Sequence, residues 1–151
     1  AMPNTPAMVL EAMSALSPNE HVSTEELQSV VAIFESFGKA EVVPESLMDA
    51  VVGVSGSSPA YVYMFIEAMA DAAVADGMPR TQAYKFAAQS VYGAAKMVLE
   101  TNTHPGVLKD AVCSPGGTTI AAIAKLEEKG LRDAVISAQR CCVAKSKDMG
   151  K

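Results

Sequence analysis

The stretch PAYVYMFIEAMADAAVA, residues 59–75, decides the fold of this chain. Pro59 follows Ser57 and Ser58 at the predicted first turn of a helix, and Gly77 ends that helix. Apolar side chains cover almost the whole circumference of the helix, so it must be buried on every side. In a chain of this length one layer of helices cannot easily enclose a central helix, whereas an interlocked homodimer can. An ordinary central core helix is the alternative.

Glu67 and Asp71 are the polar exceptions in this apolar helix. Residues four apart lie on the same face of a helix, so the two carboxylates share a side. We expect them to border a solvent channel or to pair with cations such as Arg80 or Lys85.

Helical patterns separated by Pro and Gly extend from Pro44 to the end of the chain. The predicted helices cover residues 44–52, 59–75, 79–99, 105–112, 118–128 and 131–147. We expect the first of them to break at Gly53 and Gly56, because glycine weakens a helix. Residues 45–151 are therefore predicted to form one helical domain.

Residues 1–44 have a different pattern. A short apolar segment over residues 8–16 is followed by a helix that begins at Ser23 and ends at Gly38, and then by a strand over residues 40–44. Strand, helix and strand make one layer of an α/β sheet. The predicted fold is thus mainly α, with a short α/β strip at its N-terminal side.

Composition and charge exclude several classes of function. The formal net charge is −5 and Lys and Arg form no cluster, which argues against a nucleic-acid surface. Apolar runs reach only about a dozen residues, too few to span a bilayer, and no signal-peptide layout is present. We expect a cytoplasmic protein with neither a nucleic acid nor a membrane as partner.

The cysteines and histidines do not have the spacing of a metal-binding motif. Of the three cysteines, Cys141 and Cys142 are adjacent, where a disulfide would be strained, so we expect reduced thiols. There is no Cys-x-x-Cys motif, and His21 and His104 are far apart in the sequence.

The sequence SPGGTT, residues 114–119, forms a Pro/Gly-rich turn that leads directly into the helical pattern over residues 118–128. Backbone N–H groups at such a turn lack intrahelical partners, and the helix dipole adds positive potential, which suits a small anion such as a carboxylate. The glycines allow a close approach, and the threonines add hydroxyl groups. The alternative is a tight turn between helices in which Ser114 or Thr118 is only an N-cap.

Four segments together resemble the motifs of pyrroline-5-carboxylate reductases, in the same order and spacing. They are MPNTPA at 2–7, VSGSSPAY at 54–61, HPGVLKD at 104–110 and SPGGTT at 114–119. The resemblance implies a helical dimerisation domain over residues 45–151, with residues 1–44 a remnant of a Rossmann-like dinucleotide-binding domain. The Gly-rich dinucleotide fingerprint is absent from the sequence.

The resemblance also implies a reaction and its site. These enzymes use NADPH or NADH to reduce the imino acid Δ1-pyrroline-5-carboxylate to L-proline, the last step of proline biosynthesis. By motif position, the N–H groups of Gly116, Gly117 and Thr118 and the Ser114 hydroxyl would bind the substrate carboxylate. The hydroxyl of Thr119, the candidate catalytic residue, would bind the ring nitrogen. We favour orientation over acid catalysis for Thr119, since an alcohol is a weak acid.

Cofactor contacts are implied for Met2, Pro3 and Asn4, which match a strand-end motif beside the nicotinamide; a simple loop is the alternative. The turn over residues 55–58 either touches substrate or cofactor or, as we favour, forms a hinge. A Cys113 thiolate with His104 as base is a further alternative, but no third orienting group is evident.

The sequence also leaves room for two other functions. A non-catalytic oligomerisation fragment that keeps a carboxylate-binding helix N-terminus is the rival function. The β-hydroxyacid dehydrogenases, which also join a helical to a nucleotide-binding part, expect a catalytic lysine in a context that this chain lacks. We expect a homodimer, with assembly into a higher oligomer left open.

Overall fold

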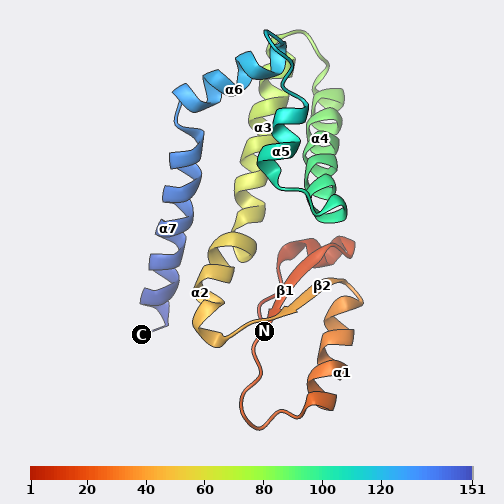
Figure 1. The fold of residues 1–151 in the computed structure, drawn as a ribbon, viewed down its shortest axis with the longest axis vertical. Helices are drawn as coiled ribbons and strands as arrows, with labels where there is room; N and C mark the ends of the chain where they lie inside the picture. The colour runs from red at the N-terminus through yellow and green to blue at the C-terminus, as the bar shows by residue number, and fades with distance from the viewer. Residues whose placement is uncertain (151) are drawn as a thin grey trace. The chain divides into compact units, whose positions relative to one another are not determined.

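The computed structural model describes residues 1–150 and divides into two compact units. One comprises Ala1–Tyr61 with Ile136–Lys151, and the other comprises Val62–Val135. The chain is mostly helical and carries a two-stranded parallel sheet, which confirms the predicted fold class (Figure 1).

The elements of the first unit are, in chain order, the 3-10 helix η1 (Thr5–Val9), the strand β1 (Ala12–Leu16), the helix α1 (Thr24–Glu35), the strand β2 (Gly38–Val42), the 3-10 helix η2 (Glu45–Leu47), the helix α2 (Met48–Val51), the π-helix η3 (Val52–Gly56), the first turn of α3 (Ser58–Ala75) and most of α7 (Leu131–Met149). β1 and β2 pair in parallel, with Ala12 opposite Gly38 and Leu16 opposite Val42. The crossover helix α1 begins with the predicted cap, in which Ser23 Oγ accepts the Glu26 N–H and the Glu26 carboxylate accepts the Ser23 N–H.

The boundaries of the α/β strip differ from the prediction at two places. The segment expected to be a strand from residue 8 is a 3-10 helix as far as Val9, and Leu10 then adopts a left-handed conformation before β1 begins at Ala12. Gly38 begins β2 and does not end α1, because the strands approach so closely that a Cβ at residue 38 would overlap the backbone of Ala12.

The predicted break at Gly53 is wrong, because the chain stays helical there as the π-helix η3, which ends at Gly56. Gly53 is buried and lies against α7, where a Cβ would stand 2.9 Å from Val143 Cγ2 and 3.0 Å from Gln139 Cγ. A close approach between helices therefore explains this glycine, and a helix end does not.

Polar contacts also join α7 to the segment around η3. The Ser146 hydroxyl donates to the Asp49 carboxylate at 2.6 Å, and the Cys142 thiol donates to Ser57 Oγ at 3.2 Å. A hydrogen bond with Cys142 raises the pKa of the Tyr61 hydroxyl above its ordinary value, and burial adds to this shift.

The second unit contains the rest of α3, α4 (Arg80–Thr101), α5 (Pro105–Ala111), α6 (Thr118–Glu128) and the start of α7. Its buried core is made of small side chains, Ala70 on α3 and Ala83 and Ala87 on α4, which let the two helices pack closely. Arg80 pairs with Asp71 and lies over the Tyr84 ring, 5.7 Å from its centroid, so the predicted ion pair is confirmed.

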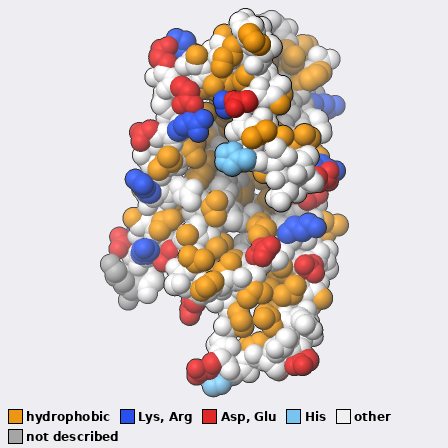
Figure 2. Space-filling view, in the orientation of Figure 1, with side chains coloured by type: hydrophobic (Ala, Val, Ile, Leu, Met, Phe, Trp, Pro, Cys, Tyr) orange, Lys and Arg blue, Asp and Glu red, His pale blue; other side chains and the backbone are white. Residues whose placement is uncertain are grey.

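Large apolar side chains of α3 and α4 remain on the surface of this unit. Tyr63 is 60% exposed, Met64 70% and Phe86 67%, so one copy of the chain does not bury α3 on every side. Figure 2 shows apolar side chains at the surface, with Lys and Arg dispersed among acidic residues on the face in view. Among the helices within residues 1–150, none has the length and apolarity needed to cross a bilayer.

Candidate functional site

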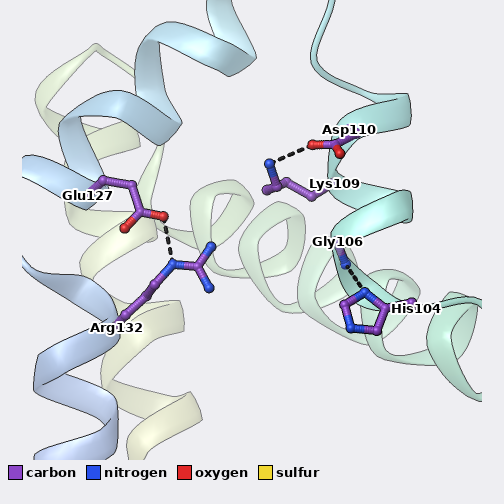
Figure 3. A network of polar contacts seen from close by, with 6 residues as sticks. All are labelled: His104, Gly106, Lys109, Asp110, Glu127 and Arg132. Carbon is purple, nitrogen blue, oxygen red and sulfur yellow. Dashed lines mark hydrogen bonds and ion pairs between the residues drawn. The ribbon is translucent and has the colours of Figure 1, made fainter.

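The candidate site is the connection between α5 and α6. α5 begins at Pro105 behind His104, whose Nδ1 accepts the Gly106 N–H at 3.0 Å (Figure 3). It ends with the Cys113 N–H donating to the Asp110 carbonyl at 3.0 Å. The turn SPGGTT follows directly, so its position is set by a short helix fixed at both ends.

Residues 114–117 form a tight turn. The Gly117 N–H donates to the Ser114 carbonyl at 3.0 Å, and Gly116 has φ +67°, a left-handed conformation that favours glycine. Pro115 followed by such a glycine is typical of a type II turn. Ser114 Oγ lies so close to Gly117 that a Cβ there would overlap it.

One of the predicted amide donors of the turn is already engaged. The Gly117 N–H was expected to be unpaired, but the Ser114 carbonyl accepts it. Gly117 is also the N-cap of α6 with no side-chain cap, so neither Ser114 nor Thr118 has the N-cap role of the alternative interpretation.

The remaining amides at the start of α6 stay available. In the described part of the chain, no acceptor is found for the N–H groups of Gly116, Thr118, Thr119 and Ile120. The Ile120 amide was missed by sequence reasoning, although the rule that the first turn of a helix leaves its N–H groups unpaired would have found it. Ser114 and Thr118 are exposed, whereas Thr119 is half-buried. This geometry suits a small anion at the positive end of α6.

Charged side chains of α5 and of the connection between α6 and α7 form ion pairs, as Figure 3 shows. Lys109 donates to Asp110 at 2.6 Å, which raises the pKa of Lys109 above its ordinary value. Arg132 Nε donates to the Glu127 carboxylate at 2.7 Å. The backbone amides therefore carry the attraction for an anion at this site.

The alternative of a Cys113 nucleophile gains no support. The Nδ1 of its candidate base His104 is engaged by Gly106, and no hydrogen bond links His104 to Cys113 within residues 1–150.

Beside the candidate site, an apolar groove of about 360 Å³ lies between helices α4 and α5. The groove is lined by Ala94, Met97, Val98, Pro105, Leu108, Lys109 and Val112.

The candidate cofactor residues Met2, Pro3 and Asn4 lie in the first unit. Met2 exchanges two backbone hydrogen bonds with Ala15 of β1, at 2.8 and 3.0 Å. Asn4 Nδ2 donates to the Ser55 carbonyl, and Asn4 Oδ1 accepts the Met13 N–H. Polar atoms of Met2 and Asn4 are thus engaged within the protein, whereas the Pro3 ring is exposed.

The family model for the pyrroline-5-carboxylate reductase dimerisation domain matches residues 45–149. This chain belongs to the pyrroline-5-carboxylate reductase family. The pyrroline-5-carboxylate reductase of Escherichia coli K12 is 64% identical over 151 residues, which cover 100% of this chain and 56% of that protein. The chain therefore spans a little over half the length of this family member.

Solved structures of the same family agree with the fold. The pyrroline-5-carboxylate reductase of Coxiella burnetii matches with a TM-score of 0.94 and 36% identity, over 99% of this chain and 56% of that one. The Plasmodium falciparum enzyme, whose structure has NADP bound, matches with a TM-score of 0.92 and 35% identity, over 99% of this chain and 62% of that one.

Proposed function

We propose that this chain is the dimerisation and substrate-binding part of a pyrroline-5-carboxylate reductase. The reaction is the reduction of Δ1-pyrroline-5-carboxylate to L-proline with NADPH or NADH. The observation that carries the proposal is the set of unpaired amides at the start of α6, next to the half-buried Thr119. In the proposed organisation residues 45–151 form the dimerisation and substrate-binding domain and residues 1–44 belong to the dinucleotide-binding domain.

The substrate needs few anchors, because it has one carboxylate and one ring nitrogen. In our proposal the amides of Gly116 and Thr118 and the Ser114 hydroxyl hold the carboxylate, while Gly117 shapes the turn and admits the ligand. The Thr119 hydroxyl then hydrogen-bonds the ring nitrogen. This hydrogen bond fixes the orientation of the C=N bond. Correct orientation of two bound reactants lowers the activation barrier substantially.

The nicotinamide cofactor supplies the hydride, and this chain contributes a surface for it. Met2 and Pro3 suit packing against a flat ring, since the Met2 backbone is paired with β1 and Pro3 has no N–H. Asn4 has its side-chain amide engaged, so its contribution is indirect.

We further propose that the chain forms a homodimer, with assembly of dimers into a higher oligomer left open. The exposed Tyr63, Met64 and Phe86 support the dimer, because large apolar surfaces of this kind mark protein contacts. The proposed location is the cytoplasm, with support from the absence of disulfides among the cysteines of the described chain.

The test uses a chimera in which this chain replaces the aligned segment of the Escherichia coli reductase. We expect NADPH to be oxidised only when the imino acid is present. The loss of nicotinamide absorbance measures this oxidation. Thr119→Val should lower kcat by about tenfold to a hundredfold, because the ring nitrogen loses its orienting partner. Thr81→Val is the matched control, since Thr81 also occupies the second position of a helix.

The outcomes separate the candidate functions. An inactive chimera that folds and dimerises would favour the oligomerisation fragment. An active chimera in which Thr119→Val and Thr81→Val behave alike would remove Thr119 from the site. Light scattering on the same samples gives the oligomer size.

A further inference from the structure

We propose that Asn4 and Ser55 are positioning residues for the hydride transfer, and that they act by holding Met2 and Pro3 in place. This inference rests on the proposed function, because it takes Met2 and Pro3 to be contacts of the nicotinamide cofactor. The expected role of Asn4 was a contact with the cofactor. In this proposal its side chain instead links three segments of the chain by hydrogen bonds.

Asn4, Ser55 and Met13 form a closed ring of hydrogen bonds. Asn4 Oδ1 accepts the Met13 N–H at 2.9 Å, and Asn4 Nδ2 donates to the Ser55 carbonyl at 3.2 Å and to Ser55 Oγ at 3.3 Å. Ser55 Oγ in turn donates to the Met13 carbonyl at 3.4 Å. The ring joins the N-terminal segment, β1 and the π-helix η3, which are up to 51 residues apart in sequence.

The chemistry of the ring requires an amide at residue 4. The position needs an acceptor for the Met13 N–H and a donor for the Ser55 carbonyl, and the asparagine side chain offers both. An aspartate would keep the shape and the acceptor but would place a second oxygen opposite the Ser55 carbonyl. An alanine would leave the Met13 N–H and the Ser55 carbonyl without these partners.

The ring fixes one end of the Met2–Pro3 segment, and the bridge between Met2 and Ala15 fixes the other. The proline ring also fixes φ between them. The side chains of Met2 and Pro3, which we propose to pack against the nicotinamide ring, are therefore held in one place. Accurate placement matters, because a shift of about 1 Å between reacting groups can cost a hundredfold in rate.

The experiment compares variants of the chimera with this chain: Asn4→Asp, Asn4→Ala, Ser55→Ala and the double variant Asn4→Ala/Ser55→Ala. The matched control is Asn19→Ala, since Asn19 Oδ1 also accepts a backbone N–H, that of His21 at 3.0 Å, in an exposed turn. Ser55→Thr keeps the hydroxyl and serves as the conservative variant. Thermal melting of each variant gives its folded fraction.

We expect Asn4→Asp and Asn4→Ala to lower kcat about tenfold, with KM for the imino acid nearly unchanged. The double variant should be no slower than Asn4→Ala, because both substitutions open the same ring. Ser55→Thr should recover most of the rate lost in Ser55→Ala. The primary isotope effect with deuterated NADPH should rise in the slow variants, since hydride transfer becomes limiting, a change that partial unfolding would not cause.

Three results would overturn the inference. The first is a folded Asn4→Ala or, if that variant does not fold, a Ser55→Ala chimera with the kcat of the parent. The second is a double variant whose losses multiply. The third is a reduced kcat with an unchanged isotope effect. In each case the parent chimera remains active, so the proposed function stands, whereas an inactive parent overturns the proposed function and this inference together.

Discussion

Gly53→Ala should destabilise this chain, although the same change in an ordinary helix stabilises it. The new methyl group would stand 2.9 Å from Val143 Cγ2 and 3.0 Å from Gln139 Cγ. Val143 lies in α7 and is β-branched, so it has essentially one rotamer in a helix and cannot turn away. The methyl group can be admitted only if η3 and α7 move apart.

Two opposing terms set the size of the effect. Overpacking of this kind costs about 1–3 kcal/mol, whereas removing a glycine from a helix gains about 0.5–1 kcal/mol. The middle of these two ranges gives a net loss of roughly 1 kcal/mol of unfolding free energy for Gly53→Ala. Gly56, in the same π-helix, has Val52 Cγ1 as its nearest neighbour at 4.0 Å, so Gly56→Ala should gain about 0.5–1 kcal/mol.

Urea unfolding at one fixed protein concentration measures both variants, because a folded dimer would make the midpoint concentration-dependent. The double variant Gly53→Ala/Val143→Ala tests the cause, since the smaller side chain at residue 143 makes room for the methyl group. We expect the unfolding free energy of the double variant to be about 1 kcal/mol higher than the sum of the two single effects would give. If Gly53→Ala and Gly56→Ala are equally stable, the close approach of η3 to α7 is refuted.

Two further predictions concern single polar groups. Ser14 in β1 is fully buried and its hydroxyl has no hydrogen-bond partner within the described chain, so Ser14→Ala should raise the unfolding free energy by about 1 kcal/mol; a loss in thermal melting would contradict this. Hydrogen bonds from Ser23 lower the pKa of Glu26 below its ordinary value of 4.5, so this interaction stabilises the fold above that pH and is lost as pH falls through the lowered pKa. The stability difference between the parent and Glu26→Gln, which removes the charged carboxylate that accepts the Ser23 N–H, should shrink over that acidic range, and a difference independent of pH would exclude the role of the Glu26 carboxylate.

Local signals predicted most of the helices, because Pro and Gly stand at their ends. The helix after SPGGTT was expected over residues 118–128 and is found at Thr118–Glu128, between Gly117 and Gly130. The predictions failed where a distant segment decides the local structure. Gly53 looked like a helix break, but its lack of a side chain serves a contact with α7, about 90 residues further along the sequence.

The same distinction applies to the candidate site. The run of amides at the start of α6 followed from local rules, since the first turn of any helix leaves N–H groups unpaired. The turn that engages the Gly117 N–H could also have been read from Pro115 and Gly116, which are typical of a type II turn. The ring of Asn4, Ser55 and Met13 could not, because its members come from three segments that only the tertiary fold brings together.

The small core of the second unit connects the sequence of α3 to the proposed dimer. Within residues 62–135 the buried side chains are Ala70, Ala83 and Ala87, each of which offers little apolar area. Fully burying a side chain as large as Met or Phe is worth about 1.5–3 kcal/mol, yet Met64 and Phe86 stay mostly exposed. The alanines let α3 and α4 approach closely and thereby leave the larger side chains pointing outward. In the proposed dimer a second copy of the chain would supply the missing burial, so the helix predicted to be buried on every side would be enclosed by two chains.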